Sequence, residues 1–201
     1  MMKTADLILN FMIFLITAVM VAGFFRKDGK WAPDRGKYAF RFYTCQSNVL
    51  CAVSALLTAV FSLSGPVPRW VWILKYIGTA AVTVTMLTVF LFLAPSVGKD
   101  WVKVLLTKSD LFMHLLTPVM ALVSFCVLEK RGMTFPVSLW GMLSVLLYGP
   151  LYLYKILYAP EEKRWNDFYG FNRQGKWPVA FAAMGTGTFL VCAGIMALQN
   201  L

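Results

Sequence analysis

Six stretches of mainly apolar residues follow one another along this chain, each about twenty residues long, the length that a helix needs to cross a bilayer. They cover roughly residues 6–25, 38–63, 70–93, 110–128, 136–157 and 177–198. Apolar side chains make up 59% of the 201 residues, against about 45–50% in soluble domains. The sequence therefore predicts an all-α, polytopic membrane protein: a six-transmembrane-helix bundle that forms a single domain over residues 1–201.

Basic residues gather on alternate loops between these stretches. The loops after the first, third and fifth stretches hold thirteen lysines and arginines, whereas the other loops and the termini hold only Lys3, Arg69, Lys130 and Arg131. Since basic loops stay on the cytoplasmic side, we expect a multi-pass cell-membrane protein with these three loops in the cytoplasm and both termini outside. A net charge of +10 in this arrangement indicates topology and lipid headgroup contacts, so membrane lipids and no nucleic acid are the expected partners.

The second stretch opens with polar side chains, which are costly in hydrocarbon unless they face a protein interior or a wet cavity. These side chains are Arg41, Thr44, Gln46, Ser47 and Asn48. On a continuous helix, Arg41, Thr44 and Asn48 recur at i, i+3 and i+7 and share one face. The pattern favours either polar contacts between helices or a reactive pocket with Thr44 at its centre.

The fourth stretch contains His114, the only histidine of the chain. Counted from the basic loops, Thr44 and His114 lie roughly 9 and 6 Å inside their stretches at 1.5 Å per residue, so both occupy one layer of the bundle. Neutral imidazole is suited to take the proton of a threonine hydroxyl near neutral pH. We therefore expect Thr44 to be a nucleophile and His114 its base if their helices are neighbours. A lone histidine inside a membrane also fits a purely structural hydrogen bond.

Three residues are expected to support this pair. Asp110 precedes His114 by one turn, where a carboxylate can fix the imidazole tautomer or simply favour the start of a helix. Asn48, one turn after Thr44, can donate a hydrogen bond to an oxyanion, and Ser47 lies beside it.

A nucleophile at this depth lies level with the upper acyl carbons of a bilayer, so we expect a lipid ester to enter laterally. Arg41 is the first candidate to hold a substrate carboxylate or phosphate, although a headgroup contact explains it equally well. Lys99 and Lys103, on a surface helix expected over residues 97–109, are further candidates. In the aromatic loop 159–176, Asp167 and Tyr169 are the next residues expected to contact substrate.

Metal and cofactor chemistry find little support in the composition. One histidine cannot build an imidazole-rich metal or haem site. The four cysteines lie inside apolar stretches without a C-x-x-C pair, and the chain has no glycine-rich phosphate loop. We therefore expect no metal and no cofactor. The sequence carries no signal for an oligomeric state.

Three short motifs resemble a known family. They are Phe42-Tyr43-Thr44, His114-Leu-Leu-Thr-Pro-Val-Met-Ala-Leu and Tyr148-Gly-Pro-Leu-Tyr. They resemble the androgen-induced and androgen-dependent TFPI-regulating proteins, a family of polytopic membrane threonine hydrolases. The resemblance implies cleavage of fatty-acid esters of hydroxy fatty acids, with Thr44 as nucleophile and His114 as base. Around Asn48 and in Trp165-Asn-Asp-Phe-Tyr-Gly-Phe the chain looks more like a bacterial branch, which leaves the substrate open.

Two other functions fit the same residues. One is a non-enzymatic membrane protein that binds or transports lipid, with the Thr44 face lining a passage. Transporters more often show internal repeats and charged residues at the midplane. Here only Lys75 lies well inside a stretch, and we expect it to extend its ammonium toward the surface. The other function is a lipid acyltransferase, which needs the same nucleophile and a second pocket for the acceptor.

Overall fold

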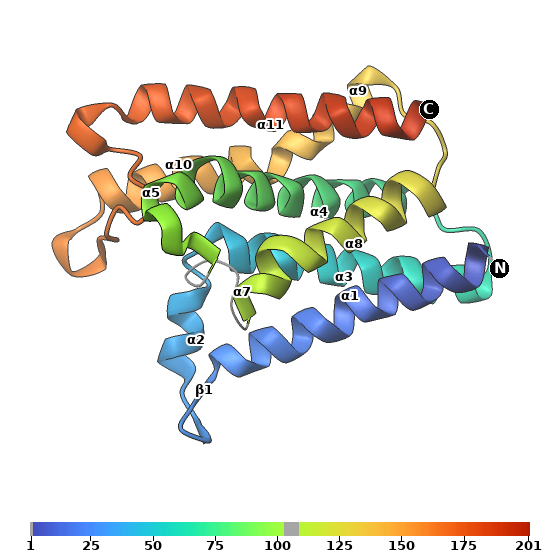
Figure 1. The fold of residues 1–201 in the computed structure, drawn as a ribbon, viewed down its shortest axis with the longest axis horizontal. Helices are drawn as coiled ribbons and strands as arrows, with labels where there is room; N and C mark the ends of the chain where they lie inside the picture. Colours follow the sequence, from blue (N-terminus) through green and yellow to red (C-terminus); the bar gives the residue numbers. More distant parts are fainter. Residues whose placement is uncertain (1, 103–108) are drawn as a thin grey trace.

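A computed structural model of the chain describes residues 2–102 and 109–201 (Figure 1). The described residues are mainly helical with almost no strand, so the expected all-α membrane bundle is confirmed. Among them, five helices are long and apolar enough to cross a membrane: Lys3–Phe24, Tyr43–Ser64, Arg69–Leu93, Phe135–Leu157 and Trp177–Asn200. The fourth expected span corresponds to a shorter apolar helix, Phe112–Leu128. Of the surface helix expected over residues 97–109, residues 103–108 lie outside the described residues, and its described start contains a 3-10 turn, Gly98–Asp100.

The elements follow one another in a simple order. The first half comprises α1 (Met2–Phe24), a hairpin of β1 (Arg26–Lys27) and β2 (Lys30–Trp31), α2 (Pro33–Ala39), α3 (Tyr43–Ser64), α4 (Arg69–Thr88), a π-helical turn η1 (Val89–Leu93), α5 (Ala94–Val97) and η2 (Gly98–Asp100). The second half comprises α7 (Ser109–Leu111), the π-helical η3 (Phe112–Leu116), α8 (Thr117–Val123), the π-helical η4 (Ser124–Leu128), α9 (Phe135–Ser138), η5 (Leu139–Met142), α10 (Leu143–Leu157), η6 (Glu161–Lys163), η7 (Arg173–Gly175) and α11 (Trp177–Asn200).

The helix α4 is the centre of the bundle. It packs against α3, α8, α10 and α11. In its most apolar segment of 18 residues 61% of the residues are buried, against 17% in the corresponding segments of the peripheral helices α1 and α11. Trp72 and Tyr76 of α4 stack against Phe125 in the largest buried cluster. The approach of α3 to α4 depends on Gly78, where a Cβ atom would lie 2.8 Å from the Cys51 Cα atom.

The second expected span is interrupted, and this part of the prediction is wrong. Helix α2 ends at Ala39, and α3 begins at Tyr43 after an extended residue, Phe42. Figure 1 shows α2 projecting away from the bundle. It carries Asp34, Arg35 and Lys37, which are costly to bury in hydrocarbon. Arg41 therefore precedes α3 and does not share a helical face with Thr44 and Asn48. The linker expected over residues 26–37 forms the hairpin and most of α2.

The two ends of the bundle carry different parts of the chain. Both termini and the α3–α4 turn lie at one end, which we call the terminal end (Figure 1). The segments that follow α1 and α10, and the described residues that follow η1, lie at the opposite end. This arrangement places the described parts of the expected basic loops together and apart from the termini. Thr44, in the first turn of α3, lies at the end with the basic loops.

Candidate functional site

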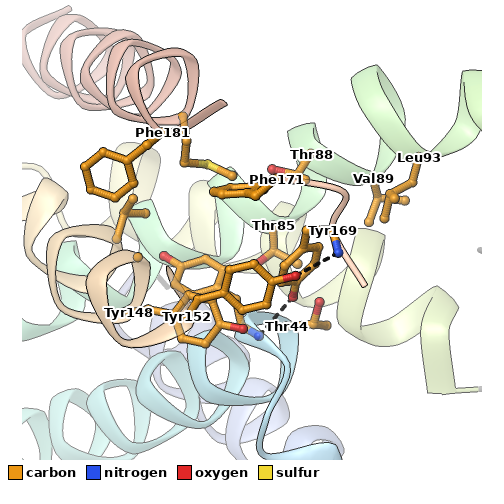
Figure 2. A pocket seen from close by; sticks show the side chains of 14 residues that line it. Thr44, Thr85, Thr88, Val89, Leu93, Tyr148, Tyr152, Tyr169, Phe171 and Phe181 are labelled. Atoms are coloured by element: carbon orange, nitrogen blue, oxygen red, sulfur yellow. Dashed lines mark hydrogen bonds between the residues drawn. The ribbon is translucent and has the colours of Figure 1, made fainter. Parts of the chain in front are cut away.

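A narrow cavity of about 40 Å³ lies beside the first turn of α3 (Figure 2). Its walls come from α3, α4 with η1, α10, α11 and the loop before α11. The lining residues are Tyr43, Thr44, Thr85, Thr88, Val89, Leu93, Val145, Tyr148, Gly149, Tyr152, Tyr169, Phe171, Phe181 and Met184. A buried water needs roughly 10–15 Å³ of such space, so the cavity holds only a few waters. An acyl chain can enter only if side chains in the wall move.

Thr44 lies at the N-terminus of α3, where backbone N–H groups lack helical partners. Phe42, the residue at the N-cap, provides no side-chain cap. The Tyr169 hydroxyl takes this role, because it accepts a hydrogen bond of 3.0 Å from the Tyr43 N–H. The same hydroxyl interacts with Thr44. Burial raises the pKa of Tyr169 above its ordinary value, so this hydroxyl stays protonated and can also donate.

The loop that carries Tyr169 is held in place by Asp167 and Tyr152. The Tyr152 hydroxyl donates to Asp167 Oδ1 at 2.8 Å and accepts from the Tyr169 N–H at 3.1 Å. The backbone N–H groups of Phe171 and Asn172 donate to the same carboxylate at 2.9 and 2.7 Å. Asp167 is exposed and does not line the cavity. It therefore shapes the loop, whereas Tyr169 reaches the cavity.

Ser47 and Asn48 are buried below Thr44 and connect α3 to its neighbours. The Ser47 hydroxyl lies 2.8 Å from the Thr85 hydroxyl of α4. Asn48 Nδ2 donates to the Thr44 carbonyl at 2.9 Å and to the Met113 carbonyl at 3.1 Å. Because both amide hydrogens are engaged with backbone carbonyls, the contacts of Asn48 fit a positioning role. It fixes η3 against the first turns of α3.

His114 follows Met113 directly, within the π-helical turn η3. The helices of Thr44 and His114 are therefore neighbours, which is the condition on which the expected pair depends. His114 is half-buried and is not among the residues that line the cavity. Asp110 lies one turn earlier and interacts electrostatically with His114. Pro118 follows in the first turn of α8 and lacks the N–H that a regular helix would offer to the His114 carbonyl.

Arg41 is exposed and packs on aromatic rings. Its guanidinium carbon lies 5.2 Å from the Tyr38 ring centroid and 5.9 Å from that of Trp165. Its carbonyl accepts a hydrogen bond of 2.7 Å from the Tyr148 hydroxyl. The side chain does not line the cavity. Arg41 thus joins α10 to the start of α3 through its backbone, and its side chain belongs to the outer aromatic surface.

Several lining residues were not expected from the sequence. Thr85 and Thr88 lie one turn apart at the end of α4, and Phe181 and Met184 lie at the start of α11. The repeat of Tyr148 and Tyr152 at i and i+4 is a signal that could have indicated a shared aromatic face on α10.

The described residues contain no group of three or more histidine, cysteine or acidic side chains placed to hold a metal ion. Comparisons with protein-family models, with curated proteins and with solved structures find no match for this chain.

Proposed function

We propose that this chain is an integral-membrane hydrolase of lipid esters, with Thr44 as the nucleophile and His114 as the general base. The observation that carries the proposal is the position of Thr44. It lies in a predominantly apolar cavity at the start of a helix, next to a backbone N–H group that faces the same space. A threonine in such a place can meet an ester carbonyl, and the helix N-terminus favours the negative charge that develops there.

In the proposed reaction, Thr44 Oγ1 attacks the acyl carbon and its proton passes to the His114 imidazole. The carbonyl oxygen becomes an oxyanion and accepts a hydrogen bond from the Tyr43 N–H. It thereby replaces the Tyr169 hydroxyl, which accepts this hydrogen bond in the absence of substrate. The alcohol then leaves with the proton from His114. Water, activated by the same imidazole, attacks the acyl-threonine, so that the fatty acid is released and the Thr44 hydroxyl is restored.

The apolar walls favour the acyl chain of a lipid as the group that is bound. The motifs around Thr44 and His114 support the substrate class of the family that they resemble, fatty-acid esters of hydroxy fatty acids. Asp110 lies where it can orient His114. Asn48 keeps η3 against α3 through its hydrogen bond to the Met113 carbonyl. Membrane lipids reach the cavity from the bilayer, with Tyr169 and Phe171 as the residues that move aside.

Covalent labelling tests the proposal. Purified protein in detergent is treated with an alkyl fluorophosphonate, and the intact mass is measured. We expect one adduct on the native chain and none on Thr44→Ala. Thr88→Ala removes another hydroxyl from the same cavity and should keep the adduct, so it is the matched control. Labelling that survives in Thr44→Ala contradicts the assignment of the nucleophile. A native chain that takes no label favours a lipid-binding or transport role.

A further inference from the structure

A second cluster of polar side chains lies at the terminal end of the bundle, away from Thr44. Its centre is Lys75 of α4, which is fully buried rather than extended toward the surface as expected. The Lys75 ammonium lies 3.4 Å from Glu129 Oε1 and 3.3 Å from the Ser124 hydroxyl, and it donates to Asn10 Oδ1. Removing two charges from water is costly, so such a cluster persists only where hydrogen bonds compensate.

The carboxyl groups of this cluster are unequally satisfied. Asp6 Oδ1 accepts from Asn10 Nδ2 at 3.0 Å and from the Ser124 hydroxyl at 3.1 Å. Glu129 Oε1 accepts from Asn10 Nδ2 at 3.1 Å and from the Ser124 hydroxyl at 2.5 Å, so Asp6 and Glu129 share the single hydrogen of that hydroxyl. Glu129 Oε2 has no hydrogen-bond partner among the described residues, although its side chain is only 7% exposed. A buried carboxylate oxygen without a donor is unfavourable, and it indicates a place where a ligand N–H can bind.

These carboxyl groups border a cavity of about 520 Å³, which we call the terminal vestibule. Its acidic residues are Asp6, which is half-buried, and Glu129, whose side chain is almost fully buried. Lys3, Lys130 and Arg131 are exposed residues of the same wall. The vestibule therefore separates charge, with acidic groups toward the buried cluster and basic groups toward solvent. A simple anion would meet only the basic residues, and a simple cation would have to pass them.

We propose that the terminal vestibule binds a small zwitterion that has a primary ammonium and an anionic group. The ammonium contacts Asp6 and, once the wall that covers Glu129 Oε2 moves aside, donates to that oxygen. The anionic group pairs with Lys3, Lys130 and Arg131. Phosphoethanolamine has this chemistry, either as a free solute or as a lipid headgroup. A quaternary ammonium has no N–H and leaves Glu129 Oε2 without a donor. This site is independent of the reaction at Thr44.

Binding to the full chain tests the proposal. Protein in phosphatidylcholine nanodiscs is titrated with phosphoethanolamine, phosphocholine and inorganic phosphate by calorimetry. In a second series, protein in mixed nanodiscs is examined by native mass spectrometry for retained phosphatidylethanolamine. One charge-assisted hydrogen bond corresponds to roughly a tenfold to hundredfold difference in affinity. We therefore expect phosphoethanolamine, or the lipid that carries it, to bind at least about tenfold more tightly than the choline form. The series that shows binding identifies the source.

Two variants of the site and one distant control variant keep the test independent of folding. Asp6→Asn keeps an oxygen acceptor for Asn10 and Ser124 and leaves the Lys75–Glu129 pair intact. We expect it to bind phosphoethanolamine about tenfold more weakly. Lys3→Ala should weaken the binding of phosphoethanolamine, and phosphocholine should bind this variant no more tightly than it binds the native chain. Lys163→Ala, at the other end of the bundle, should bind like the native chain. Equal binding of the choline and ethanolamine forms, equal binding of phosphate, native affinity in Asp6→Asn, or no binding in either series overturns the proposal.

Discussion

The Tyr169 hydroxyl occupies the N-terminus of α3, where the proposed reaction needs a donor for the substrate oxygen. It accepts the Tyr43 N–H and interacts with Thr44. An incoming carbonyl must therefore compete with this hydroxyl for the same N–H. The aromatic residues around it, Tyr148, Tyr152 and Phe168, hold the ring in place. Tyr169 thus occupies the Tyr43 N–H while no substrate is present.

Tyr169→Phe removes this competition and keeps the aromatic packing. A neutral hydrogen bond contributes about 0.5–1.5 kcal/mol, so we expect KM for a lipid ester to fall by roughly two- to tenfold. Steady-state hydrolysis in detergent measures the change. Tyr154→Phe, on the exposed side of α10, is the matched control and should leave KM unchanged. A rise of KM in Tyr169→Phe would mean that the hydroxyl holds the substrate itself.

Close packing between α3 and α4 places Thr44, Ser47 and Thr85 together. Gly78 permits this approach, because an added Cβ atom would meet backbone at Cys51 and the Ser54 hydroxyl, each at 2.8 Å. This packing brings the Thr85 hydroxyl of α4 within hydrogen-bond distance of the Ser47 hydroxyl of α3. The geometry at the start of α3 therefore depends on a glycine far from the cavity.

Gly78→Ala should destabilise the bundle, because a main-chain atom cannot move aside as a flexible side chain can. Overpacking of this kind costs about 1–3 kcal/mol in the free energy of unfolding. The apparent Tm in detergent should fall, with Gly187→Ala as the control, since a Cβ atom there meets nothing within 4 Å. Alanine favours the helix over glycine by about 1 kcal/mol, so the control should be neutral or slightly more stable. An equal response of both variants would contradict the role of Gly78.

The periodicity of the chain predicts helices well and their interruptions poorly. Apolar runs locate α1, α4, α10 and α11 because length and burial in the bilayer determine them. The break at Phe42 depends on where α2 leaves the bundle and has no local sequence signal. The π-helical turn that contains His114 does have one, because Pro118 cannot offer an N–H to the His114 carbonyl. Thr44 and His114 stand out in the sequence because they are polar residues in apolar stretches, and of the two only Thr44 lines the cavity. Asp6 and Glu129 resemble ordinary residues of helix ends.

Positive charge is distributed unevenly between the two ends of the molecule. The described parts of the basic loops lie at one end of the bundle and the termini at the other (Figure 1). If the charge bias determines orientation, the end with Thr44 faces the cytoplasm and the terminal vestibule faces the outside. Lipid esters would then reach Thr44 from the inner leaflet. This orientation follows from the distribution of lysine and arginine along the chain.

Cysteine accessibility in intact cells measures the orientation. An impermeant maleimide should label Arg69→Cys from outside and should label Lys163→Cys only after permeabilisation. Both positions are exposed, so burial does not explain a difference. The native chain is the control, because its four cysteines are buried. The reverse labelling pattern would place the basic loops outside.

The most direct measurement of the central claim is a double-variant comparison of lipid-ester hydrolysis. Thr44→Ala, His114→Ala and the combined variant are purified, and kcat/KM is measured for each against the native chain. Loss of a nucleophile or its base lowers the rate by about a hundredfold or more. If Thr44 and His114 act as one unit, the combined variant loses little more than either single variant. Hydrolysis that survives in Thr44→Ala, or losses that multiply in the combined variant, would contradict the account.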